Sequence, residues 1–132
     1  MMINVIREGT TVEVTEESLV TISSSSEVKV NKNISDIYYV RLILNEAVKE
    51  LTEKQLNLKR LKGIKFLFYK TSQDKITDKA VEAFCHTDKD VEAVALEVIN
   101  LQFKVDNLTA LVSSIIIKNE YIRELYMPVH PN

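Results

Sequence analysis

The residues best suited to chemistry lie between Lys49 and Lys70, where the chain reads KELTEKQLNLKRLKGIKFLFYK. This basic segment carries seven basic and two acidic side chains, although the whole chain has a net charge of -2. Cations hold backbone phosphates and aromatic rings stack on unpaired bases, so their mixture suits a single strand better than a duplex. The segment therefore predicts nucleic-acid binding, with a solvated basic helix face as the alternative. The candidate DNA-binding residues are Lys59, Arg60, Lys62, Lys65, Tyr69 and Lys70.

The aromatic residues of this segment allow two interpretations. Phe66 and Phe68 suit a core or an interface as well as a platform for bases, whereas the hydroxyl of Tyr69 favours a wet boundary. Gly63 interrupts the segment at a cost of about 1 kcal/mol relative to Ala in a helix. It permits either a kink or the close approach of another backbone.

The sequence offers little support for a catalytic site or a metal site. His86 and His130 are the two histidines, and Cys85 is the single cysteine. Cys85 and His86, with Asp88 and Asp90 nearby, supply at most two N or S ligands, whereas structural zinc needs about four. The sequence contains no Gly-rich phosphate loop, nucleophile elbow or HExxH run. We expect no catalytic residues, no metal and no cofactor, and hence a protein that is not an enzyme.

The element that must support the basic segment is a long helix over Asp88 to Tyr126, a stretch without Gly or Pro. Apolar residues recur there every seven positions in two interleaved registers, which predicts a seam against a partner helix. The seam consists of Val91, Val94, Val98, Leu101, Val105, Leu108, Val112, Ile115, Asn119, Ile122 and Tyr126. Asn119 is its one polar member, and it either fixes the register or binds a ligand. Thr87 is the expected N-cap, and Pro128 marks the end.

The partner is a second long helix, predicted from Ser35 to about Tyr69. Its seam has the same spacing, with Lys54 and Lys65 expected at the edge so that their ammonium groups reach water. The other seam positions are Ile37, Val40, Leu44, Ala47, Leu51, Leu58, Leu61 and Phe68. The joining segment, 71–87, carries helical spacing of its own. These patterns predict a mostly α fold: a long antiparallel helical hairpin with a short connecting helix.

Apolar residues outside the shared seam, such as Ile43 and Ile64, exceed what one hairpin can cover. We therefore expect a homo-oligomer that buries Ile115, Ile116 and Ile122.

Residues 1–34 are expected to be an extended β segment, ahead of a helical and oligomerisation domain over 35–126 and a tail over 127–132. Val12 and Val14, then Val20 and Ile22, follow a two-residue period, as do Val28 and Val30. Gly9, the segment Glu16-Glu17-Ser18 and the run 23–26 of four serines separate these stretches. They predict a small antiparallel meander, although the serine run is also typical of a flexible linker.

The chain of 132 residues, 45% hydrophobic and 27% charged, is long enough for one domain with a core. One cysteine excludes an internal disulfide, no signal peptide opens the chain, and no apolar run approaches the roughly 20 residues of a membrane span. We expect a soluble protein of a reducing, intracellular compartment, with no membrane partner.

Three stretches together resemble the UvsY-type recombination mediators of T-even-type phages. They are AVKELTEKQLNLKRLKGIKFLFYK, the later TDKDV, and KNEYIREL in the closing helix, and the similarity covers roughly residues 36–126. The resemblance implies a ring-shaped homo-oligomer in the cytoplasm of an infected bacterium. It also implies a protein that binds single-stranded DNA and helps a RecA-like recombinase replace the single-strand binding protein. The family's DNA-contacting residues fall on Lys59, Arg60, Lys62 or Lys65, whereas the extended N-terminus departs from the mostly helical family pattern.

A second functional hypothesis comes from a different class. The chain is then a helical assembly or adaptor protein, such as a phage structural or inhibitor component, whose basic segment meets an acidic protein partner. Binding to a single-stranded oligonucleotide separates the two hypotheses.

Overall fold

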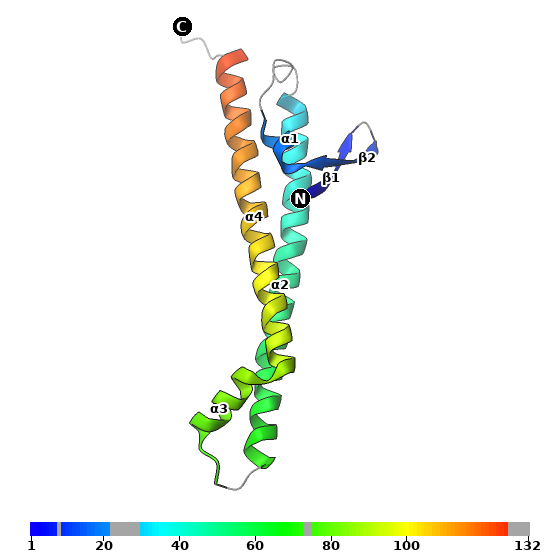
Figure 1. Ribbon diagram of the computed structural model, residues 1–132. Coiled ribbons are helices and arrows are strands. Elements are labelled where there is room, and N and C mark those ends of the chain that lie inside the picture. The colour runs from blue at the N-terminus through cyan, green and yellow to red at the C-terminus, as the bar shows by residue number, and fades with distance from the viewer. Residues whose placement is uncertain (8, 22–29, 73–74, 127–132) are drawn as a thin grey trace. The chain divides into compact units, whose positions relative to one another are not determined.

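The chain folds mainly into helices with a small antiparallel sheet at its N-terminus (Figure 1). A computed structural model describes residues 1–7, 9–21, 30–72 and 75–126. In chain order the elements are β1 (Met2–Arg7), β2 (Thr10–Thr15), α1 (Glu16–Val20), α2 (Val30–Ser72), α3 (Asp78–Thr87) and α4 (Lys89–Tyr126). This architecture confirms the expected mostly α fold, its short connecting helix and its N-terminal β element. No helix among the described residues is long and apolar enough to span a bilayer.

The helices and strands belong to two compact units. Unit 1 comprises Met1–Glu46 with Val105–Asn132, and unit 2 comprises Ala47–Lys104. The basic segment lies wholly in unit 2.

The sheet of unit 1 is a hairpin of β1 and β2, in which Ile3 pairs with Val14 and Val5 with Val12. Directly opposed residues share a face of a sheet, so these four side chains point the same way. Ile3 and Val5 are buried, so β1 supplies most of the apolar face. Gly9 follows β1 with a φ of +78°, a backbone conformation that glycine adopts without the steric cost of a side chain.

Helix α1 covers the expected separator Glu16-Glu17-Ser18 and extends to Val20, where a further strand was expected. The Thr15 hydroxyl oxygen accepts from the Ser18 amide at 3.1 Å, which caps the helix, and Glu16 and Glu17 occupy its first turn. Val20 therefore ends a helix, and its expected place in a strand is wrong. Leu19 is buried, and its carbonyl oxygen accepts from Lys118 Nζ at 3.0 Å.

The boundary between the N-terminal segment and the helical part also shifts. α2 begins at Val30, so the expected strand position of Val30 and the expected helix start at Ser35 are both wrong. The second half of the proposed meander, 22–29 with its serine run, lies outside the described residues, as does the tail 127–132.

The core of unit 1 confirms the seam of the last helix. Leu108, Ile115 and Ile122 of α4 have no exposed surface, and neither has Val40 of α2. Asn119 lies in the same row and is buried, and its side-chain oxygen has no hydrogen-bond partner among the described residues. A polar group in this position is costly, which is consistent with a role in fixing the register.

In unit 2, α2 and α4 lie antiparallel. Lys54 pairs with Glu97 at 2.7 Å and Lys65 with Asp90 at 2.8 Å, so the partner number falls as the α2 number rises. Both lysines lie at the edge of the seam, as expected, but their ammonium groups bind carboxylates of α4. Phe68 is 59% exposed, so its expected place in the seam is wrong.

The start of α4 corrects a further expectation. Thr87 is the last residue of α3, and Asp88 follows as the residue that caps α4. Asp88 Oδ1 accepts from the amides of Asp90 at 2.9 Å and Val91 at 3.2 Å. These are the second and third residues of the helix, the amides that an N-cap satisfies.

Candidate nucleic-acid interface

Three of the six candidate DNA-binding residues lie open to solvent on α2. Lys59, Arg60 and Lys62 are exposed, and none of them forms an ion pair within the described part of the chain. We call them the open cations. Positions 59 and 62 are neighbours on the helix surface, since residues three apart lie one turn from each other. The open cations can therefore meet an anion without first losing a protein partner.

The other three candidates are already bound, and we call Lys65, Tyr69 and Lys70 the held residues. Lys65 Nζ lies 2.8 Å from Asp90 Oδ2 and 3.4 Å from Asp88 Oδ2. The hydrogen bond to Asp90 is the main cause of a raised pKa for Lys65.

Lys70 is held at the far end of α2. Its Nζ lies 2.7 Å from Asp78 Oδ1 and donates to the carbonyl oxygen of Ile76 at 3.1 Å. Asp78 belongs to the first turn of α3, where a carboxylate also interacts favourably with the helix dipole.

Tyr69 is held by both its hydroxyl and its ring. The hydroxyl donates to Asp88 Oδ2 at 2.5 Å, and the ring stacks on Phe84 of α3, with centroids 5.6 Å apart. The bond to Asp88, followed by burial, raises the pKa of Tyr69. A base that stacked on the covered face would have to displace Phe84.

Asp88 connects the held residues to the start of α4. One oxygen caps the helix, and the other accepts from Tyr69 and lies near Lys65. The hydrogen bond from Tyr69 is the main cause that lowers the pKa of Asp88 below 3.8. Burial of the carboxylate opposes this effect and raises the pKa. The Val91 amide and the Lys65 ammonium also lower the pKa. The carboxylate is thus the form that this site favours.

The lowered pKa predicts that Asp88 stabilises the fold above pH 3.8 and that this contribution is lost as the pH falls through the lower folded value. The neutral variant Asp88→Asn retains a cap but has no charge. We expect it to be less stable than the parent at pH 7, with a difference that shrinks towards pH 3. Denaturant unfolding of both proteins at the two pH values measures it. A difference that is the same at both pH values would contradict the charged role.

An exposed aromatic ring lies next to the held residues. Phe68 is 59% exposed, and its ring meets that of Tyr69 edge to face at 5.2 Å. The sequence favoured Tyr69 as the stacking residue, but Phe68 is the ring with free surface. Phe84 belongs to α3, and its stacking on Tyr69 depends on how that helix packs against α2, which has no signal in the local sequence.

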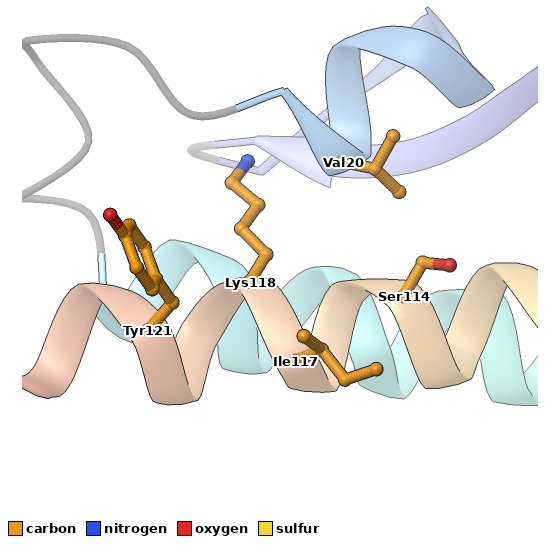
Figure 2. A pocket seen from close by; sticks show the side chains of 5 residues that line it. All are labelled: Val20, Ser114, Ile117, Lys118 and Tyr121. Atoms are coloured by element: carbon orange, nitrogen blue, oxygen red, sulfur yellow. The ribbon is translucent and has the colours of Figure 1, made fainter.

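Unit 1 carries a shallow pocket, which lies away from the basic segment in sequence. Figure 2 shows its lining, which consists of Val20, Ser114, Ile117, Lys118 and Tyr121, around a volume of about 370 Å³. The lining is mainly apolar, and Lys118 donates to the Leu19 carbonyl at 3.0 Å. Nothing in the local sequence indicated that Lys118 is buried. Its ammonium group is engaged by the protein, so the described lining residues offer no cation ready for a phosphate.

Two of the residues considered for metal binding, Cys85 and His86, are adjacent in α3. Cys85 is a buried free thiol, and His86 beside it is exposed. Within the described ranges, no group of three or more His, Cys, Asp or Glu side chains could hold a metal ion. His130 lies outside those ranges.

Comparison with known proteins adds no relative: no family model matches the chain, and neither a curated protein nor a solved structure matches it.

Proposed function

We propose that this protein binds single-stranded DNA through α2 without acting as an enzyme. The observation that supports the proposal is the exposure of the three open cations on one stretch of helix, close in sequence to the exposed ring of Phe68. Phosphates need cations, and unstacked bases need a flat ring. A single strand presents both groups, whereas a duplex hides the faces of its bases.

The resemblance to UvsY-type mediators extends the proposal to a biological role. The protein then acts as a recombination mediator in the cytoplasm of an infected bacterium. There it helps a RecA-like recombinase onto DNA covered by single-strand binding protein. A basic helix that holds phosphates without reading bases suits this task, because a mediator must bind whatever sequence is exposed.

Equilibrium binding to a labelled single-stranded oligonucleotide, beside a duplex of the same length, tests the proposal. We expect tighter binding to the single strand at every salt concentration and affinity that falls as salt rises. Absence of binding at low salt would overturn the proposal. The adaptor hypothesis, with an acidic protein against the open cations, would then take its place.

A second part of the proposal is self-association into a homo-oligomer, with a ring as the assembly that the resemblance suggests. The two long helices expose apolar side chains away from their seam in unit 2: Leu56, Ile64 and Leu67 of α2, and Leu96, Ile99 and Phe103 of α4. The three on α4 follow helical spacing, and Phe103 is 63% exposed. Apolar rows of this kind mark interaction surfaces, and a second copy offers an identical row.

We predict that the parent self-associates at micromolar concentration and that Phe103→Glu shifts it towards the monomer. A buried carboxylate without a partner opposes assembly, whereas the exposed position makes the change tolerable in a single chain. Light scattering measures the mass, and circular dichroism checks the helicity. Gln55→Glu is the matched control, because it adds the same charge at an exposed position of α2 outside the apolar rows. A parent that is monomeric at these concentrations would defeat the prediction.

A further inference from the structure

We propose that the carboxylates of Asp78 and Asp90 compete with single-stranded DNA for Lys70 and Lys65, beside a third carboxylate, Asp88, that stays in place. We call these three carboxylates the acidic latch. The inference rests on the proposed function, because it concerns the regulation of the same site. Three of six candidate side chains on α2 are bound by these aspartates, which belong to α3, to α4 and to the junction between them.

The contacts of the latch resemble those that a phosphate would make. Lys65 lies 2.8 Å from a carboxylate oxygen of Asp90, and Lys70 lies 2.7 Å from one of Asp78. Both are charge-assisted contacts between an ammonium and an anionic oxygen, the same pairing by which lysine binds a DNA phosphate. Each ammonium has three N–H donors, but its positive charge is already neutralised by the aspartate and a phosphate that approaches is repelled by that carboxylate. DNA therefore binds these cations most strongly when the aspartates release them.

Two carboxylates of the latch, Asp78 and Asp90, can release their lysines at little cost. The Asp90 side chain is 70% exposed and that of Asp78 is 71% exposed, so water replaces the lost lysine readily. Ion pairs in such positions contribute little to stability. A strand already held by the open cations brings phosphates to the same helix at high local concentration, which favours exchange.

Asp88 has a different role. Its side chain is 7% exposed, and it also caps α4 and accepts from the Tyr69 hydroxyl. Loss of its charge would affect the start of the helix as well as the latch. Asp88 is therefore the fixed part of the latch, and Asp78 and Asp90 are the exchangeable arms.

The double variant Asp78→Asn/Asp90→Asn tests the latch while Asp88 is unchanged. Binding of a labelled single-stranded oligonucleotide is measured from low to high salt. We expect affinity at low salt to rise roughly two- to fivefold for each released lysine, the size that exposed ion pairs allow. The slope of log K against log salt should become more negative by about 0.7 to 1.4, because each added phosphate contact contributes about 0.7. The lower value applies if the 3.4 Å contact with Asp88 still holds Lys65.

The matched control is Glu82→Gln/Glu92→Gln. It removes the same charge from α3 and from the first turn of α4, at exposed carboxylates that form no ion pair among the described residues. A general loss of negative charge would raise affinity equally in both variants. The latch instead predicts a steeper salt slope in the aspartate variant alone, with the helicity of both variants equal to that of the parent.

The outcomes separate the latch from the proposed function. Binding by the parent, with the same salt slope in the parent and the aspartate variant, would overturn the latch and leave the DNA site intact. An equal gain in the control variant would also overturn it. If neither the parent nor any variant bound DNA at low salt, the proposed function and the latch would fall together.

Discussion

Replacement of Ile115 by Ala is expected to lower the free energy of unfolding by about 2–5 kcal/mol, the range for a buried isoleucine truncated to Ala. The side chain has no exposed surface in unit 1, so its loss leaves a cavity that neighbouring helices fill incompletely. Domains of this size are stable by about 5–15 kcal/mol in total. One substitution thus removes a large part of the stability. Denaturant unfolding, followed by helicity at a fixed protein concentration, measures the loss.

Ile117 provides the matched control two residues away on the same helix. It is 64% exposed, so Ile117→Ala should change the free energy of unfolding by no more than about 0.5 kcal/mol in the single chain. Equal losses for the two variants would contradict the burial pattern. The measurement is repeated at several protein concentrations, because self-association would add concentration-dependent stability.

The burial of the isoleucines in α4 changes which residues we expect in an oligomer interface. The sequence placed Ile115, Ile116 and Ile122 in the buried set of an oligomer, but Ile115 and Ile122 are fully buried within one chain. Ile116 is half-buried. The apolar side chains left for another copy in unit 2 include Leu96 and Phe103. Periodicity shows which positions share a helix face, but it does not show which of two apolar faces meets the chain's own partner helix.

The long helices were predictable from the sequence because their apolar pattern is local and repeated. The heptads of α4 predicted a helix over Asp88 to Tyr126, and the structure has one over Lys89–Tyr126. Boundaries were less predictable, because several residues compete for each cap. Thr87 and Asp88 are both good N-caps. The structure uses Asp88, whose carboxylate also binds Tyr69 from another helix, a tertiary contact with no local signal.

In the candidate site, too, some features were predictable from the local sequence and others depend on tertiary contacts. The basic segment and the exposure of Lys59, Arg60 and Lys62 follow from composition and helix spacing. The pairing of Lys65 with Asp90 depends on how α4 returns along α2, and the sequence separation of twenty-five residues hides it. The role of Asp78 and Asp90 as partners of the basic segment could be found only from the fold.

The DNA site itself gives the largest expected functional effect. The double variant Lys59→Ala/Arg60→Ala should bind single-stranded DNA more weakly in every sequence context, because both side chains hold phosphates and read no base. If the three open cations each neutralise one phosphate, the parent slope of log K against log salt is about -2. The double variant should lower its magnitude by about 1.4.

The control for this variant is Lys89→Ala/Lys104→Ala, which removes the same charge from exposed positions of α4 in the same unit. If the protein attracts DNA by overall charge, both variants should lose the same affinity. If DNA binds a defined site on α2, the Lys59→Ala/Arg60→Ala variant should lose more affinity than the control. Helicity and oligomer size should match the parent in each case, because these side chains lie outside the core. If the α2 variant bound as tightly as the parent at every salt concentration, single-stranded DNA would not be the ligand of the basic segment. An acidic protein would then be the partner to test against the same two positions.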